Sequence, residues 1–327
     1  MRLIGSFLIA LFFIADVLAQ DIYSRSFVLM GSNFDITVIA EDAVEGEKYI
    51  DLAVGEIERI EKIISSWDPK SQTSNINRNA GIHAVKVSPE LFDLISRSLE
   101  ISKITDGAFD ISYASMDRIW KFDGSMKRMP FEEAIKASIS KVGYQNIALD
   151  RDNGTVFLAR KGMKIGFGAI GKGYAADRAK DLLISKGVKA GIINASGDMN
   201  TWGRQLNGKQ WTVAITNPLN KEKAFGTVPI SEGAIVTSGN YEKYVVFDEE
   251  RYSHIINPKT GYPCQGILSV TVLAPSAELA DALATSIFVM GIGVGIDRVN
   301  QLSQIECIIV DEFGEIHQSK NIQIQVL

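Results

Sequence analysis

The pattern of apolar and polar residues near the N-terminus changes its period. Phe34, Ile36 and Val38 alternate with polar residues, as in a strand with one buried face, so residues 26–40 are predicted to form a strand interrupted by a turn. Residues 43–65 instead carry an apolar residue every three or four positions, which predicts a long amphipathic helix.

Start and stop signals mark the other elements. Ser88-Pro89-Glu90 combines an N-cap hydroxyl, a proline at the first helical position and an acid that suits the helix dipole. This combination predicts a helix that runs to about Thr105. The polar residues 67–81, rich in Asn and Ser, are predicted to form a loop. Further helices are predicted at about 130–142, 171–186 and 276–290, and strands at 146–165 as a hairpin, 191–195, 211–216, 234–237, 241–247, 252–256, 268–274, 306–310 and 316–326.

The order of these elements indicates the fold class. Helices and strands are mixed, and many strand pairs are close in sequence, which favours an α+β fold with largely antiparallel sheets packed with helices over a doubly wound parallel sheet. No repeat, low-complexity tract or linker interrupts the chain. We therefore predict a single domain over residues 20–327.

The first 19 residues are typical of a secretory signal peptide. Arg2 precedes the short apolar run 3–15, and Val17-Leu18-Ala19 suits cleavage before Gln20. The run is shorter than the roughly 20 residues of a membrane span, although an uncleaved anchor is the alternative. We expect an exported, periplasmic protein whose mature chain has no membrane span.

Composition excludes some classes of partner and site. The net charge is −5 and Lys and Arg form no run, which argues against nucleic acid as a partner. Cys264 and Cys307, the two cysteines, are too few for a disulfide scaffold or a zinc site. Export would permit one bridge between them, and two separate buried thiols fit the sequence equally well.

The most informative stretch is residues 166–177, GFGAIGKGYAAD. Four glycines fall within eight positions, after a β-like run and before a helical pattern. Backbone N–H groups at a helix start, beside Lys172, suit a phosphate or diphosphate. Gly166, Gly171 and Lys172 match a P-loop, but Gly173 stands where the metal-binding Ser or Thr would be. Any metal ligands must therefore come from elsewhere.

Asp281 and Thr285 are candidates for those ligands. They are four residues apart in the last long helix and so share one face. A carboxylate and a hydroxyl are hard oxygen ligands of the kind that Mg²⁺ takes. The alternative is that Asp281 only favours the N-terminus of its helix through the dipole.

Other side chains could take part in chemistry or binding. His254 ends a predicted strand just before a turn, where it is either structural or catalytic. Trp67 and Tyr113 could stack on a flat ligand or belong to the core.

These segments, taken in order, resemble the FAD:protein FMN transferase family, also called ApbE. The resemblance covers nearly the whole chain after residue 20, and the ordered set is specific although each motif alone is weak. The matching segments are Met30-Gly31-Ser32, Trp67 with 74–78, 105–110, 168–177, 194–198, 237–241, 254–258 with Gly261, and 280–285.

The resemblance implies a T-fold-like α+β protein that cleaves the diphosphate of FAD. Such enzymes transfer FMN to a Thr or Ser hydroxyl of a target protein, release AMP and require Mg²⁺. The implied metal ligands are Asp281, Thr285 and a backbone oxygen of Ala169. The implied contacts to FAD are Met30, Trp67, Ala108, Phe109, Asp110, Lys172, His254, Ile255 and the position of Gly166.

The resemblance also suggests catalytic roles. Lys172 would neutralise phosphoryl charge together with the metal. His254 is a candidate for orienting or deprotonating the incoming hydroxyl, with Asp281 as its rival. Many members carry an acid in place of Gly166 and Asp in place of Asn257, and the usual lipid-anchor cysteine is missing here.

The acceptor protein could be a subunit of a redox-driven ion pump or another flavin carrier. Three readings compete with the transferase: hydrolysis of FAD to FMN and AMP, a flavin-binding protein without turnover, and an exported domain without flavin chemistry. The Asp281/Thr285 pair argues against the second, and the ordered motifs argue against the third.

Overall fold

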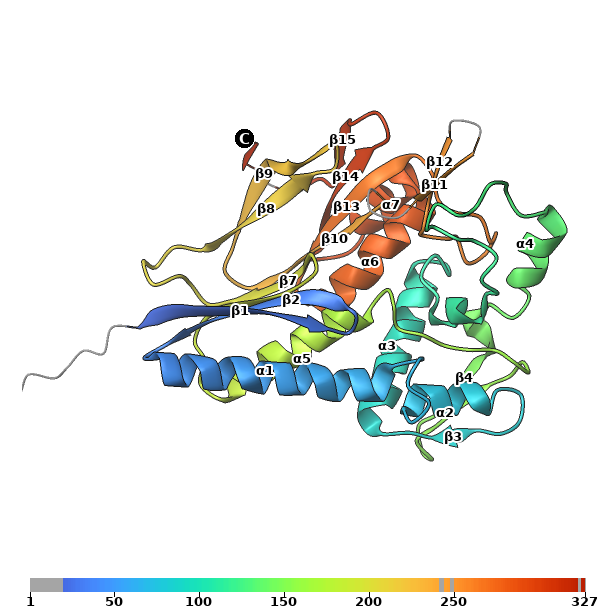
Figure 1. Ribbon diagram of the computed structural model, residues 1–327, viewed down its shortest axis with the longest axis horizontal. Coiled ribbons are helices and arrows are strands. Elements are labelled where there is room, and N and C mark those ends of the chain that lie inside the picture. The colour runs from blue at the N-terminus through green and yellow to red at the C-terminus, as the bar shows by residue number, and fades with distance from the viewer. Residues whose placement is uncertain (1–19, 241–243, 248–249, 323–324, 327) are drawn as a thin grey trace, which may run out of the picture.

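The computed structural model of the protein describes residues 20–240, 244–247, 250–322 and 325–326 (Figure 1). The predicted signal peptide, residues 1–19, and part of the strand predicted at 241–247 lie outside the described residues. Within the described ranges, no helix is both long and apolar enough to cross a membrane.

The centre of the molecule is an eight-stranded sheet in the order β1-β2-β6-β7-β10-β13-β14-β15. All of its neighbouring strands are antiparallel. This confirms the predicted α+β fold with largely antiparallel sheets. The strands are β1 (Asp21–Leu29), β2 (Ser32–Ala40), β6 (Gly191–Ala195), β7 (Asp198–Trp202), β10 (Gly233–Gly239), β13 (Ile267–Ala274), β14 (Glu306–Asp311) and β15 (Ile316–Gln318).

Three helices pack against one face of this sheet: α1 (Ala43–Ile64), α5 (Gly171–Ser185) and α6 (Ala277–Met290). A small sheet of β8 (Trp211–Asn217), β9 (Asn220–Ile230) and β16 (Gln325–Val326) packs against part of the other face. Side chains alternate between the two faces of a strand. Val236 of β10 therefore enters the core beneath the helices, whereas its neighbour Ile235 enters the core beneath β8 and β9.

Smaller elements surround one end of the sheet (Figure 1). They include a three-stranded sheet in the order β3-β5-β4 and a separate hairpin, β11-β12. Their bounds are α2 (Gln72–Arg78), β3 (Val85–Lys86), α3 (Pro89–Ile104), η1 (Ile111–Ser115), α4 (Glu132–Ser138), η2 (Tyr144–Asn146), β4 (Ile147–Asp150), β5 (Thr155–Leu158), β11 (Tyr244–Phe247), β12 (Glu250–Ser253) and α7 (Ile292–Val299).

Helix starts follow the sequence signals closely. Ser88 accepts a hydrogen bond from the Leu91 N–H at the start of α3, as predicted, with Pro89 at the first helical position. Ser276 caps α6 in the same way by accepting from the Leu279 N–H at 3.3 Å. Each cap satisfies one backbone donor that the helix leaves free.

The predicted loop at 67–81 is wrong, because α2 forms within it. Ser71 caps this helix by accepting from the Ser74 N–H, and Thr73, Ser74 and Ile76 are buried. A seven-residue polar helix gives no clear period, so the pattern could not reveal it. Strands β7 and β9 and helix α7 were likewise not predicted, and the strand predicted at 316–326 is limited to β15 and β16 in the described residues.

Candidate functional site

A cavity of about 650 Å³ opens at the end of the sheet where α6 meets the loops after α1 and α3. Its volume lies in the range typical of small-molecule sites. The lining brings together most of the residues predicted for FAD or metal: Trp67, Ala108, Phe109, Asp110, Gly166, Ala169, His254, Ile255 and Thr285.

The other three predicted residues lie outside this lining. Met30 occupies the β1–β2 turn with φ +51, and its methyl carbon lies 3.7 Å from where a Cβ on Gly171 would be. Lys172 lies in the first turn of α5, and Asp281 lies one turn before Thr285 on α6.

The glycines of the 166–173 stretch permit close packing. A Cβ on Gly168 would lie 2.3 Å from the Tyr113 hydroxyl, and one on Gly173 would lie 2.2 Å from the Ala277 carbonyl oxygen of α6. Residue Ile170, at the N-cap of α5, provides no side-chain cap. The stretch thus lets α5 begin against Tyr113 and α6. The Gly171 and Gly173 N–H groups donate to the Phe167 carbonyl and to Asp281, so an anion at this helix start would rely on the remaining donors and on Lys172.

Three charged side chains form a buried cluster beside this helix start. The Lys172 ammonium donates to Asp198, and the two side chains are 26% and 2% exposed. Burial lowers the pKa of Lys172, but the attraction of Asp198 and Asp281 outweighs burial and leaves this pKa raised. Burial, followed by repulsion from Asp281, raises the pKa of Asp198 to about 8.

Asp281 is the second acid of this cluster. Its Oδ2 accepts from the Gly173 N–H at 3.4 Å, a weak contact. Burial raises the pKa of the Asp281 carboxyl, against the effects of Lys172 and the Gly173 N–H. A buried acid with so little compensation indicates a functional group rather than a structural one.

The residues around Asp281 fit a hard divalent cation. Asp281 supplies a carboxylate, Thr285 a hydroxyl one helical turn later, and Ala169 a backbone carbonyl in the same cavity wall as Thr285. Carboxylate, hydroxyl and carbonyl oxygens are the ligands that Mg²⁺ prefers, with phosphate and water completing the shell.

A different group of potential ligands lies on the turn between β14 and β15. Among the described residues, Asp311, Glu315 and His317 bring ligand atoms within 4.8 Å of one another. Asp311 already accepts from the Phe313 and Glu315 N–H groups and pairs with His317 at 2.8 Å. These contacts account for Asp311 as a turn residue, and none of the three lines the cavity.

Aromatic side chains stand at the cavity. Trp67 is 74% exposed, and the Arg118 guanidinium lies 4.3 Å from its ring centroid. Tyr113, in η1, places its hydroxyl beside Gly168. These rings can contact a flat ligand on one side while their other side stays on protein or solvent. His254 is exposed just after β12, with the Phe122 ring 6.5 Å from its own.

Two residues of interest have structural partners. Asp110 accepts from the Ser112 N–H at 2.7 Å and from the Tyr144 N–H at 2.8 Å. Asn257 accepts from the Lys259 N–H at 2.9 Å in the turn after His254. An amide oxygen serves this turn as well as a carboxylate would.

Sequence reasoning gave no role to Asp198 or Arg118. Asp198 follows Gly197, which has φ +99, and this turn aims the carboxylate of the first β7 residue at α5. The signal was the Ser196-Gly197-Asp198 turn after an apolar strand. Arg118 lies in a loop without periodic pattern, so no sequence signal pointed to its contact with Trp67.

Comparisons with known proteins agree on one family. A sequence model described as the ApbE family matches residues 30–309. An FAD:protein FMN transferase of Klebsiella pneumoniae (strain 342) is 32% identical over 297 residues, covering 90% of this chain and 91% of the relative.

Solved structures give the same result. The crystal structure of the ApbE protein from Thermotoga maritima has a TM-score of 0.83 and 31% identity, covering 92% of this chain and 97% of that one. The apo flavinyl transferase ApbE of Pseudomonas stutzeri has a TM-score of 0.82 and 25% identity, covering 93% of this chain and 96% of that one. The chain belongs to the ApbE family, as its ordered motifs predict.

Proposed function

We propose that this chain is an FAD:protein FMN transferase that requires Mg²⁺, modifies a Thr or Ser hydroxyl of another protein and releases AMP. Family membership supports the activity, since relatives such as the Klebsiella pneumoniae protein carry this name. The observation that carries the proposal is the buried Asp281 at 4% exposure, one turn from Thr285 in the wall of a cavity with an aromatic rim.

FAD fits this cavity in one general arrangement. Trp67 and Tyr113 offer aromatic faces for one of its two ring systems. The start of α5, with the positive end of its helix dipole and with Lys172, suits the diphosphate. For Lys172 to reach a phosphate oxygen, its ammonium must share or leave Asp198. The ion pair holds the ammonium near the helix start until FAD binds.

The reaction is a phosphoryl transfer. The acceptor oxygen forms a bond to the phosphorus of the FMN half, and the bond from that phosphorus to the bridging oxygen breaks, so that AMP leaves with this oxygen. Lys172 offsets the negative charge that grows on the phosphoryl oxygens. When bound by Asp281, Thr285 and the Ala169 carbonyl, Mg²⁺ would supply Lewis-acid stabilisation of the same oxygens.

His254 is the better candidate for the base that takes the hydroxyl proton. It is exposed at the cavity, where a side chain of another protein can arrive, and imidazole is the side chain that enzymes most often use for proton transfer. Asp281 is buried beneath the site and is better suited to the metal. Replacing His254 should therefore reduce transfer more than it reduces FAD binding.

We also propose that the protein is exported, which the signal-like sequence of residues 1–19 supports. The acceptor would then be a periplasmic protein segment, or the periplasmic part of a membrane protein, with an accessible Thr or Ser. A redox-driven ion pump subunit of this kind meets both conditions.

The test uses residues 20–327 with FAD, Mg²⁺ and an acceptor domain that carries a Ser/Thr flavinylation segment. We expect AMP release together with flavin fluorescence on the denatured acceptor band, and loss of both when the metal is chelated. If AMP is released but the acceptor band is not fluorescent, a control without the acceptor is needed. AMP release in that control would establish FAD hydrolysis. Intact FAD that stays bound would overturn the proposal in favour of a binding protein.

A further inference from the structure

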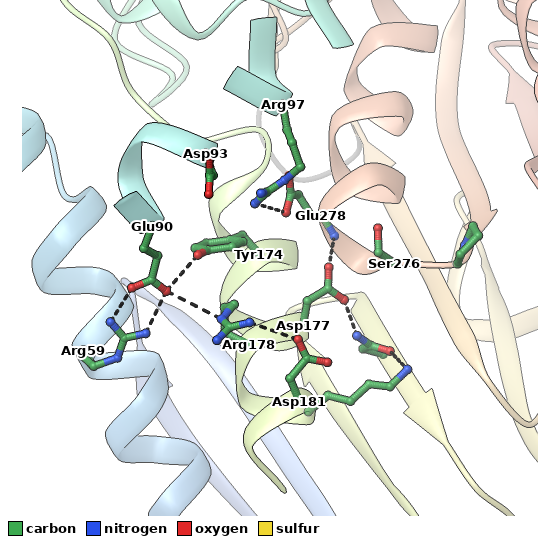
Figure 2. Close-up of a pocket in the computed structure, with 13 residues that line it drawn as sticks. Arg59, Glu90, Asp93, Arg97, Tyr174, Asp177, Arg178, Asp181, Ser276 and Glu278 are labelled. Atoms are coloured by element: carbon green, nitrogen blue, oxygen red, sulfur yellow. Dashed lines mark hydrogen bonds and ion pairs between the residues drawn. The ribbon is translucent and has the colours of Figure 1, made fainter. Parts of the chain in front are cut away.

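A second cleft, of about 730 Å³, lies on the other side of α5 and α6, and Figure 2 shows its lining. Its charged side chains come from α1, α3, α5 and α6 and are mostly paired with one another. Arg59 binds Glu90 at 2.6 Å, Arg97 binds Glu278 at 2.7 Å, and Arg178 binds Asp181 at 3.2 Å. Because most of these charged groups are already paired, few of them remain to bind a ligand. These side chains instead hold neighbouring elements together.

Asp177 differs from the other acids of this cleft, because it binds backbone rather than an arginine. Its Oδ1 accepts from the Ala277 N–H at 2.9 Å and its Oδ2 accepts from the Glu278 N–H at 2.8 Å. Figure 2 shows this carboxylate lying between α5 and the start of α6. Asn200 of β7 donates to the same Oδ1 and fixes the side chain from the sheet.

These contacts are half of a reciprocal arrangement. Asp177 of α5 caps the first turn of α6, while Asp281 of α6 accepts from the Gly173 N–H in the first turn of α5. Each helix start therefore carries an acid from the other helix, where the dipole favours a negative charge. The absence of a Cβ on Gly173 lets the two first turns touch, since that atom would lie 2.2 Å from the Ala277 carbonyl oxygen.

We propose that Asp177 is a positioning residue for the metal site, because it fixes the start of α6, and with it Asp281 and Thr285, against α5. Asp281 is four residues after Ala277, so the backbone that Asp177 binds lies one helical turn before the Asp281 carboxylate. The inference rests on the proposed assignment of Asp281 and Thr285 to the metal.

Among the described residues, the other contacts of the α6 start do not combine these properties. Ser276 caps α6 from within the same chain segment and makes no link to α5. Arg97 holds Glu278 through a bidentate pair, but its side chain is 48% exposed and the pair is open to screening by salt. In the part of the chain that the structure describes, Asp177 is the side chain that joins α6 backbone to α5 and, through Asn200, to the sheet.

The test is Mn²⁺ binding to the purified chain, followed by electron paramagnetic resonance, in the wild type and in Asp177→Asn. An amide of the same shape cannot accept from both N–H groups, because one of its two ends is a donor. We expect Mn²⁺ affinity to fall about tenfold, as with other partners that orient metal ligands. In turnover, the Mg²⁺ concentration for half-maximal rate should rise by a similar factor, while kcat at saturating Mg²⁺ stays within about twofold.

Asp181→Asn is the matched control. It removes the same charge one turn later on α5, from the same cleft, but Asp181 pairs with the half-buried Arg178 rather than with the backbone of α6. Unchanged Mn²⁺ affinity is expected. If both variants lose affinity equally, the effect is one of net charge and the inference is wrong, as it is if Asp177→Asn binds like the wild type.

Two further measurements keep the test decisive. If circular dichroism shows that Asp177→Asn is unfolded, Asp177→Glu replaces it, because it keeps the charge but moves the carboxylate by one methylene relative to the Ala277 and Glu278 N–H groups. A two- to threefold loss of Mn²⁺ affinity is expected, and no loss counts against the inference. Asp281→Ala should abolish binding. A wild type that binds no Mn²⁺, or an Asp281→Ala variant that binds normally, overturns the metal assignment itself rather than the role of Asp177 alone.

Discussion

Gly173→Ala is the sharpest test of the packing that builds the site. The added Cβ would meet backbone atoms of α6: the Ala277 oxygen at 2.2 Å, the Ala277 carbonyl carbon at 2.5 Å and the Glu278 nitrogen at 2.9 Å. Ordinary contact begins at 3.4 Å, so the first turn of α6 must retreat by more than 1 Å. Backbone cannot rotate away as a flexible side chain can.

The expected change in stability is the difference of two terms. Overpacking of this kind costs up to about 3 kcal/mol. Alanine in place of glycine within a helix returns about 0.5–1 kcal/mol. The net loss is about 2 kcal/mol in the free energy of unfolding, which lowers Tm by about 3 °C in a chain of this size.

Thermal unfolding followed by circular dichroism measures this loss, with Gly55→Ala as the control. Gly55 lies exposed in α1, and its added Cβ would meet nothing within 4 Å, so the same substitution should raise Tm slightly there. Gly173→Ala should also weaken Mn²⁺ binding, because Asp281 moves with α6. A Tm at or above that of the wild type, with unchanged Mn²⁺ affinity, would refute the close approach of α5 and α6.

Three other substitutions test the site itself. Asp281→Ala should abolish FMN transfer and also the rise in Tm that we expect from Mg²⁺ binding to the wild type. The variant should still fold at neutral pH, because burial raises the folded-state pKa of Asp281 and its ionised form therefore destabilises the fold. Normal turnover would show that Asp281 does not bind the metal. Lys172→Ala should raise the KM for FAD, as added salt should for the wild type, and equal KM values in both tests would exclude Lys172 from the diphosphate. Trp67→Ala should weaken FAD binding by about 1 kcal/mol, which a flavin fluorescence titration measures. The Tm should be nearly unchanged, because Trp67 is 74% exposed. Unaltered affinity would show that the ring systems of FAD bind elsewhere.

The fold class was predictable because local signals agree with the tertiary structure. The Ser88 cap, the apolar period of α1 and the close strand pairs all reappear in the structure. What stayed hidden had no such signal. Helix α2 is short and polar, and strand β7 reads DMNTW, so its burial comes from neighbours that are distant in sequence.

The structure brings most of the predicted site residues to one cavity, but the contacts that connect them had no signal in the sequence. The glycines of 166–173 read as a phosphate cradle, and only the structure shows that Gly168 and Gly173 are also required by Tyr113 and α6. Likewise Lys172 read as a free cation, whereas it pairs with Asp198. Pairs such as Asp177 with Ala277 are 100 residues apart, and no pattern within one helix reports them.

The balance of charge around Asp281 argues that a cation completes this site. Lys172 is the ammonium of the cluster, and it is already committed to Asp198. The diphosphate proposed to bind at the start of α5 would add negative charge at a place where Asp281 is buried and where burial raises the pKa of its carboxyl. Unbalanced charge in such surroundings is costly, and one lysine cannot offset two carboxylates and a diphosphate together. Lys172 binds Asp198 and leaves Asp281 without an ammonium partner. A divalent cation would therefore be stabilised most by the carboxylate of Asp281.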